Sequence, residues 1–151
     1  MSKKGNKEAD APGAGPDAAA RFADLVEVRV RNRDFLSLDD ETALLEEGVK
    51  TYGLPLAQAR GIILDVAENN DTALAREIEK GVEQWVKTAA GRNKKLGRKQ
   101  FNEMVTAYEN GSSHELSAAD CQKRVKTLME RNDVQPKRAG LTMSKRWYNK
   151  I

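Results

Sequence analysis

The sequence predicts an all-α fold, a compact bundle of about six or seven short-to-medium helices with a disordered N-terminal tail. Three observations support this prediction. Apolar residues recur at helical spacing in successive segments, residues that cap helices stand at both ends of those segments, and no two segments show the alternation expected of paired strands. Only 5% of the 151 residues are aromatic, so we expect an aliphatic core.

Residues 1–20 are expected to form the disordered tail. After Met1 they contain no apolar residue larger than Ala, so burial cannot offset the entropy that is lost on ordering. Residues 21–151 are expected to fold as a single helical domain. No internal repeat with a fixed period is evident in it.

The segment Phe22–Leu36 fits two patterns. Its apolar residues lie on one face of a helix, but Val26, Val28 and Val30 also alternate with charged residues as in a strand. The choice between helix and strand for residues 24–31 stays open. We favour a helix because no partner strand is visible in the rest of the chain.

Two helices are predicted between Ser37 and Asn70. Ser37 and Asp40 form a capping box, which satisfies the first free amides of a helix, and Gly53 can adopt the left-handed conformation that ends one. Pro55 suits the first position of the second helix. The residues expected to face inward are spaced by three or four positions. They are Leu38, Thr42, Leu45, Val49 and Tyr52 in the first helix, and Leu56, Ala59, Ile63 and Val66 in the second.

Further helices are predicted after Asp71, which is placed to cap the first of them. Gly91 ends that helix and Gly111 ends the next, while Ser117 and Asp120 form a second capping box. The residues expected to face inward again have helical spacing. They are Leu74, Ile78, Val82 and Trp85, then Phe101, Met104, Val105 and Tyr108, then Cys121, Val125 and Leu128, and finally Met143, Trp147 and Ile151 in a short last helix.

The net charge of +3 hides an uneven distribution. Residues 37–91 carry five cations and eleven carboxylates, whereas residues 92–151 carry fourteen cations and six carboxylates. Two interpretations stay open: the two halves attract each other within one fold, or the basic half binds an acidic partner, which is either nucleic acid or protein.

The sequence lacks the residues that most catalytic and metal-binding sites require. A single cysteine, Cys121, and a single histidine, His114, exclude an internal disulfide and a thiolate zinc site. The glycines at 91 and 97 do not match the spacing of a phosphate-binding loop. No apolar run approaches the length of a membrane span, and no secretory signal is present. We therefore expect a cytoplasmic protein without catalytic residues, cofactor, metal or membrane insertion.

One stretch is similar to a known motif. Residues Gly91–Phe101 resemble the back half of an EF-hand loop, with Leu96 at its central apolar position and Gln100 at its last ligand position. The resemblance implies a loop between two helices. Calcium requires several carboxylate oxygens, and this loop is strongly basic. We expect a metal-free helix–loop–helix corner and assign no family.

Cations in the basic half are candidates for binding. Arg98 and Lys99 stand in the first turn of a predicted helix, where the helix dipole disfavours cations. Aromatic residues alternate with cations in residues 145–150, a composition that can stack on bases and pair with phosphates. The candidate contacts for a protein partner or nucleic acid are Lys94, Lys95, Arg98, Lys99, Lys123, Arg124, Lys145, Arg146 and Trp147. Trp147 has a second interpretation, in which its ring docks the last helix on the core.

The expectation favoured by these observations is a small non-enzymatic helical module that binds another protein through a groove or face between its helices. An acidic face would offer one docking surface and the basic half another. The acidic face is formed by Glu46, Glu47, Glu77, Glu79 and Glu83. The alternative is a nucleic-acid-binding accessory protein that uses the basic half.

Overall fold

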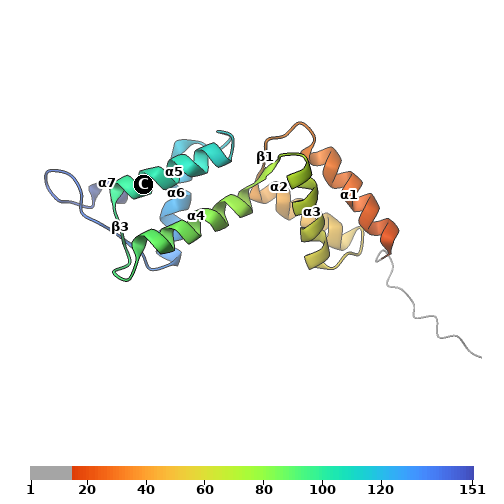
Figure 1. Ribbon diagram of the computed structural model, residues 1–151, viewed down its shortest axis with the longest axis horizontal. Coiled ribbons are helices and arrows are strands. Elements are labelled where there is room, and N and C mark those ends of the chain that lie inside the picture. The colour runs from red at the N-terminus through yellow and green to blue at the C-terminus, as the bar shows by residue number, and fades with distance from the viewer. Residues whose placement is uncertain (1–14) are drawn as a thin grey trace, which may run out of the picture. The chain divides into compact units, whose positions relative to one another are not determined.

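The computed structural model describes residues 15–151, and within them the chain is all-α, as the sequence predicts (Figure 1). Seven helices form in these residues. They are α1 (Pro16–Val30), α2 (Leu38–Lys50), α3 (Leu56–Asn69), α4 (Ala75–Ala90), α5 (Arg98–Gly111), α6 (Ala118–Arg131) and α7 (Arg146–Asn149). Four strands of two residues accompany them. They are β1 (Phe35–Leu36), β2 (Ala73–Leu74), β3 (Lys95–Leu96) and β4 (Gln135–Pro136). β1 pairs with β2, and β3 with β4, both in parallel, so each pair joins two loops.

The structure corrects the boundary of the predicted tail. Residues 16–20 are helical because α1 begins at Pro16, a residue that suits the first position of a helix. Ala18 is 2% exposed and belongs to the buried face of α1. The remaining part of the predicted tail, residues 1–14, lies outside the described residues.

Residues 24–30, which fit both a helical and a strand pattern, belong to the helix α1. Phe22, Val26 and Val30 lie on the buried face of α1, whereas Val28 is 66% exposed. The alternating valines therefore follow the helical period, and the favoured interpretation is confirmed.

Contacts divide the described residues into two units. Unit 1 contains the described residues up to Arg33 together with Leu38–Thr72, and in it α3 packs against both α1 and α2. Unit 2 contains Asp34–Ser37 and Ala73–Ile151, and in it α4, α5 and α6 pack against one another. Within residues 15–151, no helix has both the length and the apolar content to cross a membrane.

Two segments of the chain, residues 35–74 and residues 95–136, share one arrangement. In each, a strand leads into a helix, a second helix follows, and a second strand pairs with the first. Their buried positions correspond. Glu41, Leu44, Leu45 and Gly48 of α2 each lie 60 positions before Phe101, Met104, Val105 and Tyr108 of α5. Ala59, Ile63 and Ala67 of α3 each lie 62 positions before Cys121, Val125 and Met129 of α6.

The second helix of each segment also ends in the same way. The side chains of Asn70 and Asn132 donate from Nδ2 to the carbonyl oxygen four residues earlier, at 2.8 and 2.7 Å. The next residues, Asp71 and Asp133, adopt the left-handed conformation, with φ of 55° and 56°. Asn and Asp tolerate that conformation because their short polar side chains can bond locally. The structure therefore repeats one helical motif, although the sequence alone shows no repeat with a fixed period.

This ending corrects the role predicted for Asp71. It does not cap α4, which begins at Ala75 after an extended Leu74. Asp71 instead continues the turn that ends α3, and β2 intervenes before the next helix. The corner that resembles an EF-hand loop has the expected helix–loop–helix form, because α4, β3 and α5 follow one another and Leu96 is fully buried.

Some predicted inward faces are rotated. Leu45 and Ile63 are buried as predicted, and all four residues predicted for α5 are buried. In α4, however, Trp85 is 38% exposed and Val86 is buried in its place. One residue rotates a helix by about 100°, so an error of one position moves a side chain out of the core.

Candidate functional site

The carboxy-terminal segment of unit 2 docks on α5 and α6 through aromatic rings. The indole Nε1–H of Trp147 donates to the carbonyl oxygen of Lys137 at 3.0 Å. The Trp147 ring meets Phe101 edge-on, with centroids 5.3 Å apart, and meets Tyr148 in the same way at 5.7 Å. Lys126 Nζ lies 4.6 Å from the centroid of the Tyr148 ring and donates to the Tyr148 carbonyl oxygen at 3.4 Å. The docking interpretation of Trp147 is therefore what the packing shows.

Tyr148 is buried in this docking. Burial, and secondarily the charge of Glu130, raise the pKa of the Tyr148 hydroxyl to about 12. The predicted last helix is shorter than expected, because α7 contains only residues 146–149. Met143 lies outside it with a left-handed φ of 48° and is 61% exposed.

A short hairpin precedes α7. The backbones of Ala139 and Ser144 exchange hydrogen bonds of 2.9 and 3.1 Å, and Gly140 takes the positive φ of 83° that the turn requires. Leu141, at the tip, is fully exposed. The hairpin holds Thr142 and Ser144 beside α7.

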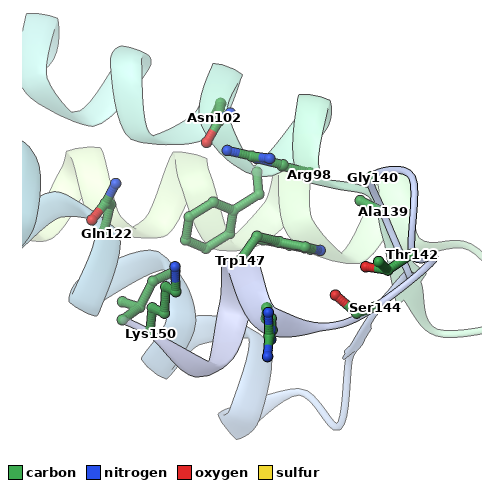
Figure 2. Close-up of a pocket in the computed structure, with 12 residues that line it drawn as sticks. Arg98, Asn102, Gln122, Ala139, Gly140, Thr142, Ser144, Trp147 and Lys150 are labelled. Carbon is green, nitrogen blue, oxygen red and sulfur yellow. The ribbon is translucent and has the colours of Figure 1, made fainter.

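Between the hairpin, α5, α6 and α7, unit 2 forms a pocket of about 340 Å³ (Figure 2). Three cations line it. They are Arg98 in the first turn of α5, Arg146 in α7, and Lys150, which directly follows α7. Neutral polar side chains and two aromatic rings complete most of the lining. They are Asn102, Gln122, Thr142, Ser144, Phe101 and Trp147.

Figure 2 shows Trp147 in the middle of this lining. The hairpin residues Thr142 and Ser144 lie on one side of it, and Gln122 and Lys150 lie on the other. The aromatic docking therefore also brings together side chains that are far apart in the sequence.

The pocket has an unbalanced charge. No Asp or Glu is among its lining residues. In the part of the chain that the structure describes, the side chains of Arg98, Arg146 and Lys150 make no ion pair, in contrast to Arg131 and Arg33. The positive end of the α5 dipole adds to the potential at Arg98. A bound anion would supply the missing charge.

The structure brings together three of the nine predicted contacts, namely Arg98, Arg146 and Trp147. The other six lie outside the pocket. Lys95, Lys99, Lys123 and Lys145 are exposed, Lys94 lines a separate hollow of about 220 Å³, and the guanidinium of Arg124 lies 5.9 Å from the centroid of the Tyr108 ring.

Lys150 was missing from the predicted contacts, although the sequence contains a signal for it. It follows Arg146 by four positions, a spacing that places two side chains on one helix face. Tertiary packing brings α7 close to Arg98 and Gln122, and no local sequence pattern predicts this packing.

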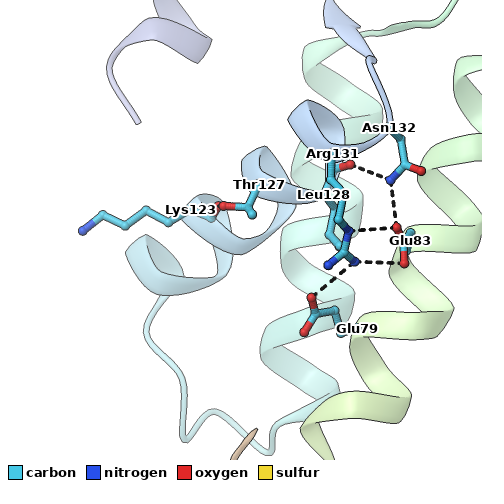
Figure 3. Close-up of polar contacts among 7 residues, drawn as sticks. All are labelled: Glu79, Glu83, Lys123, Thr127, Leu128, Arg131 and Asn132. Atoms are coloured by element: carbon cyan, nitrogen blue, oxygen red, sulfur yellow. Dashed lines mark hydrogen bonds and ion pairs between the residues drawn. The ribbon is translucent and has the colours of Figure 1, made fainter.

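Part of the predicted acidic face is engaged within unit 2 (Figure 3). Arg131 Nη2 of α6 lies 2.9 Å from Glu83 Oε2 and 3.5 Å from Glu79 Oε1, both on α4. Asn132 Nδ2 donates to Glu83 Oε1 at 2.9 Å, and this hydrogen bond, with the Arg131 contacts, lowers the pKa of the Glu83 carboxyl. These two glutamates therefore stabilise the packing of α4 against α6.

Metal binding and nucleophilic catalysis by a thiol both find little support among the described residues. Residues 15–151 contain no group of three or more His, Cys, Asp or Glu side chains that could hold a metal ion. Cys121 is fully buried, and burial, followed by the charge of Glu109, raises the pKa of its thiol. A raised pKa disfavours the nucleophilic thiolate.

The sequence matches no family model, and no curated protein or solved structure is similar enough to match it.

Proposed function

We propose that this protein is a non-enzymatic helical module that binds an acidic segment of another protein in the pocket of unit 2. One observation carries the proposal: Arg98, Arg146 and Lys150 line a single hollow that has no Asp or Glu in its lining. Like charges repel one another when they are gathered without a counter-charge, so such an arrangement favours an anionic ligand. We also place the protein in the cytoplasm, in keeping with its single unpaired cysteine.

The polar lining supports a peptide as the ligand. Asn102 and Gln122 carry amides that both donate and accept, and Thr142 and Ser144 carry hydroxyls. These groups can bond the backbone of a bound segment while the cations bind its carboxylates. Because the three cations are exposed, the attraction should weaken markedly as salt screens it.

The alternative is nucleic-acid binding by the exposed cations of unit 2, such as Lys95, Lys99 and Lys123. These residues could contact phosphates outside the pocket. Base stacking on Trp147 is disfavoured, because its ring packs on Phe101 and its N–H is already bonded to Lys137. The protein partner is therefore the preferred proposal.

The test is a titration of the full chain with fluorescently labelled hexaglutamate, and separately with mixed-sequence DNA and RNA, at 50 and 200 mM salt. We expect hexaglutamate to bind and the binding to weaken with salt. Arg98→Glu should weaken it by about tenfold or more, because the change replaces an attraction by a repulsion. Lys99→Glu, one residue further along the same helix and outside the pocket, is the matched control and should have a small effect.

Two results would contradict the proposal. Equal losses in the Arg98 and Lys99 variants would indicate a diffuse effect of net charge. Tight, salt-sensitive binding of DNA or RNA without binding of hexaglutamate would favour the alternative.

A further inference from the structure

We infer that the group bound in the pocket is a phosphate monoester on a side chain of the partner segment, an inference that rests on the proposed function. The pocket would then recognise a phosphorylated segment rather than an acidic segment of any kind. Three features of the lining support this choice: its charge, the shape of its donors and its size.

The charge of the lining exceeds what one carboxylate can balance. Arg98, Arg146 and Lys150 contribute three positive charges, and no Asp or Glu side chain is among the lining residues. A carboxylate brings one negative charge, whereas a phosphate monoester brings about −1.5 to −2 at neutral pH, together with three strong acceptor oxygens. The dianion therefore balances more of the lining.

The donors suit a tetrahedral group. Two of the three cations are arginines, whose planar forks bind phosphate oxygens in pairs. Arg98 and Arg146 come from different helices and the hairpin hydroxyls of Thr142 and Ser144 from a third element, so donors surround the hollow on several sides. Oxygens that point in several directions can use such donors more fully than the two coplanar oxygens of a carboxylate.

The size and the aromatic lining favour a phosphate that is attached to a carbon chain. A hollow of about 340 Å³ lies at the lower end of ordinary ligand pockets, and it exceeds what a small inorganic anion alone would fill. Trp147 and Phe101 line the same hollow and offer apolar contact to the side chain that carries the phosphate. A phosphorylated residue can use both parts of the lining at once.

The experiment uses the full chain and three labelled peptides that differ at one position, which is Ser, Glu or phosphoserine. We expect the phosphoserine peptide to bind about tenfold or more tightly than the Glu peptide. Its advantage should grow from pH 5 to pH 7, because the second phosphate ionisation has a pKa of about 6. Inorganic phosphate should compete, and Arg146→Gln should reduce the advantage, whereas Lys123→Gln, outside the pocket, should preserve it.

The outcomes separate this inference from the proposed function. If the Glu and phosphoserine peptides bind equally and both respond to Arg146→Gln, the proposed function stands and the phosphate inference is wrong. If free phosphoserine binds but no peptide does, the inference about the anion stands and the protein partner is wrong. Displacement of the phosphoserine peptide by DNA at lower concentrations than by free phosphoserine would overturn both.

Discussion

Trp147 shows at the scale of one residue how folding and the candidate site depend on each other. Its ring packs on Phe101 and Tyr148, its N–H bonds the Lys137 carbonyl, and the same ring lines the pocket. The sequence offered docking and base stacking as two roles for this side chain. Spacing alone could not decide between them, because the partner Phe101 lies 46 positions away in the chain.

Trp147→Ala should therefore destabilise the fold. We expect the free energy of unfolding to fall by about 2 kcal/mol, less than the ~3–5 kcal/mol typical of a fully buried ring, because Trp147 is partly exposed. Urea denaturation measures the loss. Leu141→Ala is the control, since Leu141 is fully exposed and should change stability by no more than about 0.5 kcal/mol. Equal effects of the two variants would show that the ring does not dock.

Glu83 predicts a pH dependence of stability. Its pKa is lowered in the folded state, chiefly by the Asn132 hydrogen bond and then by Arg131, so folding favours the charged form. The resulting stability is fully present above the ordinary glutamate pKa of about 4.3, and it is lost as the pH falls through the lowered pKa. Urea midpoints between pH 6 and pH 3 measure this loss.

Glu83→Gln should make that acid-induced loss smaller. Glu103→Gln, at an exposed glutamate of α5, is the control for the loss of one carboxylate. A parallel profile for the Glu83 variant and the unchanged protein would show that the Arg131 network contributes nothing to the pH dependence.

At the scale of elements, α2 and α5 show why some helix faces could be predicted and others could not. The buried face of α5 consists of two aromatic and two aliphatic side chains, and its spacing predicted it correctly. The corresponding face of α2 contains Glu41 and Gly48, which a pattern of apolar residues does not recognise. The predicted face was consequently rotated toward Val49, which is 39% exposed.

Gly48 lies where α2 packs closely against α1 and α3. A Cβ atom at Gly48 would lie 2.8 Å from Cζ of Phe22 and 3.1 Å from Cβ of Ala59. Phe22 is fully buried, so its ring has little room to move. We expect Gly48→Ala to destabilise unit 1, because overpacking costs ~1–3 kcal/mol and outweighs the gain in helix propensity.

Gly81→Ala in α4 is the matched comparison, because a Cβ placed there meets no atom within 4 Å apart from its chain neighbours and the backbone of its own helix. It should stabilise the protein by about 0.5–1 kcal/mol, the usual gain from replacing glycine inside a helix. Thermal denaturation of both variants shows whether each substitution raises or lowers the stability. A stabilising Gly48→Ala would mean that α1, α2 and α3 pack less closely than described.

At the scale of the whole molecule, the chain uses one helical motif twice and gives the two copies different charge. Helix formation, most helix ends and the basic carboxy-terminal half could be predicted, because they depend on local residues. The repeat, the division into two units and the pocket could not, because they depend on which helices pack together. The segment that follows β4 supplies Arg146, Trp147 and Lys150 to the second copy, so the pocket arises there.

The pocket of unit 2 is proposed to bind an anionic segment, and the two tryptophans of the chain allow a direct test. Trp147 lines the pocket, whereas Trp85 of α4 does not, so their indole N–H signals in an NMR spectrum report on two separate places. We predict that titration of the full chain with hexaglutamate shifts the Trp147 indole signal and the backbone amides of Arg98 and Ser144, and leaves the Trp85 signal in place. An unchanged Trp147 signal at saturating peptide, or an equal shift of the Trp85 signal, would show that the peptide does not bind in this pocket.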